Sequence, residues 1–138
     1  LCDQLVGIDL SNSMIKQAKL KRVYDKLEHI EIIEYLSFQE LDFDYFVSAD
    51  VFVYIGNLTE IFRLVKSRNK RNGKLIFSTE HTEKDGFHLQ KTGRYAHSKS
   101  YIEMLCAQFN YKLTYFAKPN LRKEQGKFIE GGLYLLDF

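Results

Sequence analysis

The sequence predicts an α/β protein in which strands and helices alternate along most of the chain. Three short apolar runs each end at an acidic residue, and helical stretches come between and after them. The runs are LVGI before Asp9, FDYFVSAD ending at Asp50 and KLIFSTE ending at Glu80. Strand-then-helix units in series favour a mostly parallel sheet with right-handed crossovers.

The first unit is a strand at Leu5–Ile8, whose unbroken apolar run suits a strand covered on both faces. Ser11 is a favourable N-cap for a helix with Met14, Ile15 and Ala18 on one side. Two further elements follow, and periodicity does not separate strand from helix there. We expect a strand within Val23–Ile30 and a short helix within Glu31–Phe38.

The middle of the chain predicts a buried strand at Phe43–Asp50, followed by a helix and a second strand. Apolar residues recur at helical spacing, and Asn72-Gly73 is expected to end the helix. The strand at Lys74–Glu80 comes next. The apolar positions of the helix are Leu58, Ile61, Phe62 and Val65.

The last third predicts a long polar loop, one helix and an antiparallel pair of strands. Thr82–Ser98 is long enough for a lid or a substrate loop. Ser100–Glu103 has the form of a capping box, which starts a helix with an apolar face. Tyr111–Ala117 alternates, with Tyr111, Leu113, Tyr115 and Ala117 on one side. Gly126 marks a turn before a final strand, Phe128–Leu136, which Gly131-Gly132 interrupts.

Composition indicates a single globular domain over residues 1–138. The chain is 45% hydrophobic and has a net charge of +2, so charge gives no argument for binding nucleic acid or a membrane. The basic run Lys66–Arg71 is best explained as the cationic end of a helix. Cys2 and Cys106 make no disulfide framework, which favours a cytoplasmic protein. His29, His81, His88 and His97 show no metal-ligand spacing, so we expect no metal site.

The acids at the strand ends are the candidate binding residues, because ligands of open parallel sheets bind beyond the carboxyl ends of the strands. The two oxygens of Asp9 match the two hydroxyls of a ribose, and Met14 is placed to pack on an adenine ring. The alternative is that Asp9 only favours the helix N-terminus through its charge. Asp50 and Glu80 carry the same alternative.

Five segments together resemble the class I S-adenosylmethionine-dependent methyltransferases, in the subgroup often fused to tetratricopeptide repeats. They are GIDLSNSMIKQAK, FDYFVSADVFVYIGNL, GKLIFSTE, TGRYAHSKSYI and LRKEQGKFIEGGLYLL. The resemblance covers nearly the whole chain. It implies a Rossmann-like sheet with strand order 3-2-1-4-5-7-6 and methyl transfer from S-adenosyl-L-methionine. We expect a small-molecule acceptor, because the Thr82–Ser98 loop is short for a macromolecular platform and the surface is not basic.

The resemblance also assigns residues. Asp9 would bind the ribose, Leu10 and Met14 would flank adenine, and Glu28 or His29 would meet the adenine amine. The segment Ser48–Tyr54 would pass beneath the methionine part. The expected cofactor-binding residues are Asp9, Leu10, Ser11, Met14, Glu28, Asp50, Val51 and Tyr54. Residue type and position, rather than the resemblance, give the expected substrate contacts, which are Glu80, His81, Arg94, Tyr95 and His97. The alternative is a surface or loop-anchoring role for His81 and His97 and tethering of the long loop by Arg94. No general base is identified.

The family's first strand and its glycine-rich turn are not found in this sequence. We therefore expect an N-terminally truncated methyltransferase domain that is weak or inactive by itself, unless an upstream segment or a second copy completes the sheet. The alternative is a non-catalytic interaction module completed by a strand from a partner or a second copy. A nicotinamide-dependent dehydrogenase also uses an acid after the second strand, but it does not call for the antiparallel tail.

Overall fold

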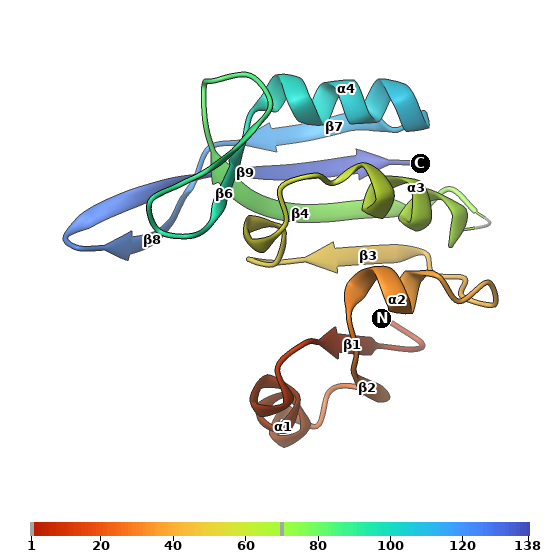
Figure 1. Ribbon diagram of the computed structural model, residues 1–138. Coiled ribbons are helices and arrows are strands. Elements are labelled where there is room, and N and C mark those ends of the chain that lie inside the picture. Colours follow the sequence, from red (N-terminus) through yellow and green to blue (C-terminus); the bar gives the residue numbers. More distant parts are fainter. Residues whose placement is uncertain (1, 70) are drawn as a thin grey trace. The chain divides into compact units, whose positions relative to one another are not determined.

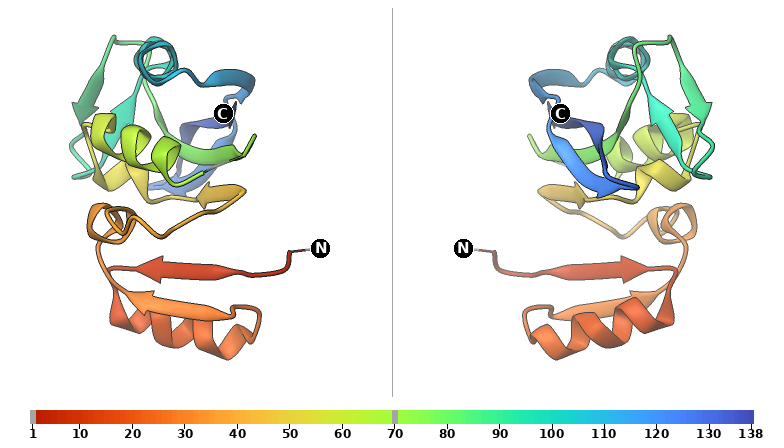
Figure 2. Two further views of the ribbon diagram at one scale, coloured as in Figure 1. Left: turned by 90° about the vertical axis from the view of Figure 1, so that its right-hand side faces the viewer. Right: turned by 90° about the vertical axis from the view of Figure 1, so that its left-hand side faces the viewer.

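The computed structural model describes residues 2–69 and 71–138, and the chain forms two compact units. The first unit extends to Glu40, and the second runs from Leu41 to Phe138. Figure 1 and Figure 2 show the helices and strands of each unit.

The first unit is a two-stranded parallel sheet with a connecting helix. The Ser11 hydroxyl accepts a hydrogen bond from the Met14 backbone N–H, so Ser11 is the N-cap of α1, as predicted. The helix ends at Arg22, whose backbone is left-handed. The predicted strand and short helix after it are both confirmed. The elements are β1 (Val6–Asp9), α1 (Asn12–Lys21), β2 (Lys26–His29) and α2 (Ile32–Leu36).

The second unit is a seven-stranded mixed sheet. Along its main path the strand order is β5-β6-β4-β9-β7, with β3 paired to β4 and β8 paired to β9. Strands β3, β4 and β6 are parallel, whereas β9 is antiparallel to β4, β7 and β8. The strands are β3 (Tyr45–Ser48), β4 (Lys74–His81), β5 (Phe87–Leu89), β6 (Tyr95–His97), β7 (Lys112–Ala117), β8 (Asn120–Glu124) and β9 (Lys127–Asp137). The helical elements are the single turn η1 (Phe52–Tyr54), α3 (Thr59–Ser67) and α4 (Lys99–Phe109).

Phe77, in the middle of β4, is the centre of the second unit's core. Its ring lies 5.0 Å from that of Tyr134 on β9, 5.1 Å from Phe52 and 5.7 Å from Phe62, measured between centroids. Phe52, Phe62, Phe77 and Tyr134 are almost completely buried. This aromatic packing joins β4 and β9 to α3 and to the turn η1.

The predicted α/β class is confirmed, but the sheet is less parallel than expected. The 11-residue strand β9 lies between β4 and β7 and runs antiparallel to both. The sequence did predict an antiparallel C-terminal pair. The strand order implied by the resemblance, 3-2-1-4-5-7-6, puts the last strand between strands 5 and 6, and the position of β9 between β4 and β7 agrees with it.

The burial of β3 and the end of α3 differ from prediction. Strand β3 is not buried as expected: Tyr45 is 65% exposed and Val47 is 71% exposed. These residues alternate along β3 and so lie on one face of it, and within the described residues β3 pairs with β4 alone. Helix α3 ends at Ser67 rather than at Asn72-Gly73, because the backbone of its C-cap, Arg68, leaves the helical region with φ −97° and ψ 15°.

Three corrections concern the segments after β4. Thr82–Ser98 is not a loop throughout but contains the hairpin β5–β6, with Gly86 at positive φ just before β5 and Gly93 at positive φ in the turn between the strands. Helix α4 begins two residues early, because Ser98 rather than Ser100 accepts the capping bond from the Tyr101 N–H. Strand β7 has an irregularity between Leu113 and Tyr115, which breaks the expected alternation.

The C-terminal hairpin differs in two ways. Strand β8 was not predicted, because LRKE has no apolar alternation. Strand β9 runs without interruption through Gly131 and Gly132. A Cβ atom on Gly131 would lie only 2.2 Å from the Leu121 side chain, so the glycine permits close packing of β8 and does not end the strand.

No helix within the described ranges is both long enough and apolar enough to cross a bilayer.

Two buried tyrosines give a matched test of this core. Tyr111 donates a 2.7 Å hydrogen bond to the Phe62 carbonyl, whereas the hydroxyl of Tyr134 has no partner among the described residues. A buried hydroxyl without a partner has lost its hydrogen bonds to water, and no protein group replaces them. We expect Tyr134→Phe to raise the free energy of unfolding by about 1 kcal/mol and Tyr111→Phe to lower it by about the same amount.

Urea unfolding of both variants measures the effect, and each serves as the other's control because both remove one hydroxyl. Destabilisation by Tyr134→Phe would show that its hydroxyl is in fact satisfied.

Candidate functional site

Asp9 ends β1, and its carboxylate shapes the turn into α1. Its Oδ1 accepts a 2.7 Å hydrogen bond from the Ser11 backbone N–H. His29 lies opposite Asp9 on β2, and its Nε2 donates to the Leu10 carbonyl over 2.8 Å. These bonds hold the turn from both strands, and they leave Oδ2 of Asp9 without a partner within the described part of the chain.

Two exposed apolar side chains lie in the sequence next to Asp9. Leu10 is 68% exposed and Met14, in the first turn of α1, is 50% exposed. The first unit therefore offers a carboxylate oxygen together with uncovered apolar surface. A nucleoside, with a ribose diol and a flat base, has the complementary groups.

Glu28 and His29 were alternative contacts for the adenine amine. Glu28 lies opposite Ile8, and its carboxylate pairs with Lys26 at 2.6 Å. The hydrogen bond that Lys26 donates to Glu28 raises the pKa of Lys26 above its ordinary value. His29 is therefore the candidate next to Asp9, one residue further along β2.

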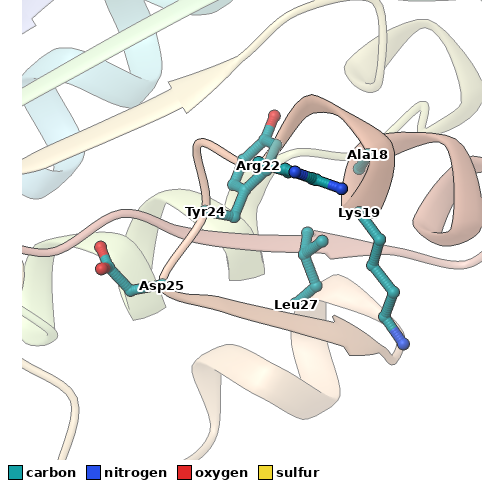
Figure 3. Close-up of a pocket in the computed structure, with 6 residues that line it drawn as sticks. All are labelled: Ala18, Lys19, Arg22, Tyr24, Asp25 and Leu27. Atoms are coloured by element: carbon teal, nitrogen blue, oxygen red, sulfur yellow. The ribbon is translucent and has the colours of Figure 1, made fainter.

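The hollow shown in Figure 3 lies at the other end of these strands. Asp25 precedes β2 and accepts a 2.6 Å hydrogen bond from the Leu5 N–H, whereas Asp9 is the last residue of β1. The hollow is thus at the amino edge of the sheet and contains none of the predicted site residues. It is lined by Ala18, Lys19, Arg22, Tyr24, Asp25 and Leu27.

In the second unit, five charged residues form one connected network, here termed the strand-end cluster. Arg122 of β8 is at its centre and uses three of its nitrogens. Its Nη1 pairs with Asp50 at 3.1 Å, its Nε with Glu124 at 2.8 Å, and its Nη2 with Glu80. The cluster consists of Asp50, Glu80, Arg94, Arg122 and Glu124.

Glu124 joins the two arginines of the strand-end cluster. Arg94, from the β5–β6 hairpin, also pairs with Glu124, and its guanidinium lies 5.7 Å from the ring centre of Tyr54. The hydrogen bond from Arg122 holds the pKa of Glu124 below its ordinary value. The structure thus brings together four predicted residues, Asp50, Tyr54, Glu80 and Arg94.

Asp50 has an unusual backbone. Its φ is 57°, in the left-handed region, and its N–H donates to the Ser78 hydroxyl at 3.1 Å. Val51 and Tyr54 follow and are 39% and 60% exposed. Left-handed backbone at a residue other than glycine is found preferentially at functional sites. The turn after β3 therefore presents three predicted residues on the surface of the second unit.

His81 lies at the end of β4, beside a second and smaller charged group. Its Nε2 is 3.1 Å from Glu83, and Glu130 is near enough for the three side chains to share one ion. The Lys118 ammonium pairs with Glu83 at 2.8 Å and with Glu130 at 3.8 Å. A lysine already supplies the positive charge between these two carboxylates.

His97 is completely buried and faces the main chain. Its Nε2 lies 3.0 Å from the carbonyls of both Ile55 and Gly56, so this nitrogen is the donor. Burial lowers the pKa of His97 below its ordinary value of 6.5. This position makes His97 an anchor for the segment after η1. Tyr95 packs with Phe87 on the neighbouring strand β5.

The basic run Lys66–Arg71 has structural partners. Lys66 donates a 2.7 Å hydrogen bond to the Asn110 carbonyl, and Arg71 pairs with Asp44 at 3.4 Å. Lys70 lies outside the described residues.

Arg122 and Glu124 are the two members of the strand-end cluster that sequence analysis missed. LRKE reads as an exposed charged stretch, and pairing across the sheet cannot be read from local periodicity. The one signal was the alternation of Arg122 and Glu124, which places both on the same face of a strand.

A sequence profile of a methyltransferase domain family matches residues 3–129. The chain belongs to this methyltransferase family. Among solved structures, it is similar to a candidate S-adenosylmethionine-dependent methyltransferase from Listeria monocytogenes, with 17% identity, a TM-score of 0.76 and coverage of 99% of this chain and 80% of that one. An S-adenosylmethionine-dependent methyltransferase from Clostridium acetobutylicum shows 17% identity, a TM-score of 0.71 and coverage of 99% and 75%.

A third neighbour is the magnesium protoporphyrin IX methyltransferase from Synechocystis, solved with bound S-adenosylmethionine. It is 14% identical, with a TM-score of 0.68 and coverage of 97% of this chain and 59% of that one. These neighbours confirm the predicted Rossmann-like methyltransferase fold, and the family supports S-adenosyl-L-methionine as the cofactor. The link to tetratricopeptide repeats stays a prediction.

A curated relative from Haemophilus influenzae, a protein of uncharacterised function, is 32% identical over 85 residues. The match takes in 56% of this chain and 34% of the relative. The chain thus spans about a third of that relative's length.

The buried His97 predicts a pH dependence of stability. Because its pKa is lower in the folded protein, the unfolded chain binds the proton more readily. The contribution of neutral His97 to the free energy of unfolding is therefore complete above pH 6.5 and is lost as the pH falls toward the folded-state pKa. We expect the free energy of unfolding to fall between pH 7 and pH 5, and to fall less steeply in His97→Gln.

Urea titrations at a series of pH values measure this slope. His88→Gln is the matched control, since His88 is on the outer strand β5, where its ring Nε2 donates to the Asp85 carbonyl. A His97→Gln slope equal to that of the wild type would contradict the prediction.

Proposed function

We propose that the chain catalyses methyl transfer from S-adenosyl-L-methionine to a small-molecule acceptor. The observation that carries the proposal is the end of β1, where Asp9 keeps one carboxylate oxygen for a ligand beside the exposed side chains of Leu10 and Met14. Membership of the methyltransferase family supports the reaction.

The residues of the first unit fit the nucleoside part of this cofactor. Asp9 would accept hydrogen bonds from the ribose hydroxyls, with Ser11 fixing the carboxylate from the other side. Leu10 and Met14 would cover the two sides of the adenine ring. His29 or Glu28 would face the adenine amine.

The resemblance assigns Asp50, Val51 and Tyr54 to the methionine part. Residue type and position make Glu80, His81, Arg94, Tyr95 and His97 the candidates for acceptor contacts. Of these, His97 is completely buried and donates to main-chain carbonyls, which favours a role in anchoring the chain. The strand-end cluster supports a polar environment around Asp50 and Glu80. Bound S-adenosyl-L-methionine supplies a methyl group on a positively charged sulfur. The task of the residues is to orient the acceptor in line with that bond, which requires positioning more than a nucleophile of the protein.

Binding by this chain is expected to be weak. A charge-assisted contact such as that of Asp9 contributes roughly 1.5–3 kcal/mol, against association costs of several kcal/mol. Two-dimensional NMR with S-adenosylhomocysteine is therefore the first test. Saturable shifts of the Asp9, Ser11 and Met14 amides would support the proposal, and saturable binding of NADH in place of S-adenosylhomocysteine would overturn it.

Asp9→Asn tests the role of the carboxylate. The amide keeps the size of the side chain and can still accept from the Ser11 N–H, but it loses the charge. We expect the Kd for S-adenosylhomocysteine to rise about tenfold or more, the loss of one charge-assisted hydrogen bond. Asp3→Asn, an exposed acid ahead of β1, is the matched control and should leave the Kd unchanged.

A second candidate function is an interaction module whose sheet is completed by a strand from a partner or a second copy. Among the strands that the structure describes, β3 pairs with β4 alone, and its Tyr45 and Val47 side chains are exposed, which favours strand addition. Size-exclusion chromatography with light scattering separates the two. A stable oligomer that does not bind S-adenosylhomocysteine would favour the module.

The near-balanced charge and the structural partners of Lys66 and Arg71 support the proposal that neither nucleic acid nor a membrane is a partner. We propose a cytoplasmic location, which is supported by the two free thiols, Cys2 and Cys106.

A further inference from the structure

Arg122 pairs with carboxylates from three different places along the chain. It lies on β8, yet two of its three partners come from other parts of the sheet: Asp50 follows β3 and Glu80 is the second-last residue of β4. Its third partner, Glu124, is on β8 itself. One guanidinium therefore ties together three places on the carboxyl edge of the second unit's sheet.

The surroundings make these bonds consequential. The Glu80 side chain is only 6% exposed and that of Arg122 is 19% exposed, so water competes poorly for the charges. The cluster holds three carboxylates and two guanidiniums. Without Arg122, Glu80 would be a buried carboxylate facing Asp50 with no other positive partner among the described residues.

The strand-end cluster also connects the β8–β9 hairpin to the edge of the sheet. Strands β8 and β9 form a hairpin that extends past the carboxyl ends of β3 and β4, as Figure 1 shows. The two-residue turn at Gln125-Gly126 is at positive φ, so its backbone is fixed locally. Arg122 and Glu124 are the groups through which this arm bonds to the sheet edge and to Arg94.

We infer that Arg122 is a positioning residue for methyl transfer: it fixes the carboxylates of Asp50 and Glu80 at the strand ends and holds the β8–β9 hairpin beside them as a wall of the acceptor site. This inference rests on the proposed function. It deepens that function by naming the residue that sets the geometry of two predicted site residues.

The guanidinium group is essential to this role. Its planar fork donates in three directions to Asp50, Glu80 and Glu124. A lysine ammonium keeps the charge but cannot match that fork. We therefore expect the affinity for S-adenosylhomocysteine to decrease from the wild type to Arg122→Lys and further to Arg122→Ala.

The first experiment needs no ligand. Amide hydrogen exchange on the whole chain should show roughly tenfold faster exchange in β8 and in Lys127–Glu130 for Arg122→Ala. The amides of Leu133–Leu136, which lie between β4 and β7, should exchange as in the wild type. Unchanged exchange in the hairpin would overturn the claim that Arg122 holds it.

The second experiment measures binding of S-adenosylhomocysteine by NMR titration, following the Asp50 and Val51 amides. We expect Arg122→Ala to raise the Kd about tenfold, and added ethylguanidinium, but not ethylammonium, to lower it again. A residue with a merely structural role would change the melting temperature without this selective rescue.

A double-mutant cycle makes the positioning claim specific. If Arg122 acts through Asp50, then Arg122→Ala combined with Asp50→Asn should bind no more weakly than Asp50→Asn alone. Arg63→Ala is the matched control, because Arg63 makes an exposed pair with Glu60 on α3, and it should leave the Kd unchanged.

The outcomes separate the two proposals. A wild-type chain that does not bind S-adenosylhomocysteine overturns both the proposed function and the positioning role. A wild-type chain that binds, with Arg122→Ala binding equally well, overturns the positioning role alone. If Arg122→Ala does not fold, Arg122→Lys and Glu124→Gln carry the same comparisons.

Discussion

The antiparallel insertion of β9 is the constraint on which the second unit depends. This strand pairs with β4 over seven residues, with β7 on its other side and with β8 at its beginning. Tyr134 on β9 stacks against Phe77 on β4, so the pairing also closes the aromatic core. Because β9 is longer than its neighbours, its first residues extend past the end of β4. The hairpin that carries Arg122 is a direct result of that excess length.

The two sheets of the chain use acids at strand ends in different ways. In the first unit, a backbone N–H holds Oδ1 of Asp9, and Oδ2 is left able to accept from a neutral ligand group. In the second unit, Asp50 and Glu80 are already paired with a guanidinium. The same position in the fold thus gives one carboxylate for direct recognition and two whose geometry is set by an arginine.

Local patterns predicted the elements of this chain but not their long-range pairing. The strand at Asp9, the Ser11 cap and the apolar face of α3 were predicted correctly, because each depends on residues within a few positions of one another. The exposure of Tyr45 and Val47, the unbroken run through Gly131-Gly132 and the existence of β8 depend on what lies alongside each strand. The same limit applied to the site: Asp50 and Glu80 were found as strand ends, but their shared partner is more than 40 residues away in the sequence.

The left-handed backbone of Asp50 limits which residues its position accepts. Glycine adopts this conformation freely, and asparagine and aspartate adopt it more easily than other residues with a side chain. Of these three, only aspartate brings a charge to Arg122. Substitution of Asp50 by asparagine or glycine during evolution can thus leave the turn intact. Such a substitution would remove the ion pair with Arg122 but leave the protein correctly folded. The fold alone would then not show that the chemistry of the site has changed.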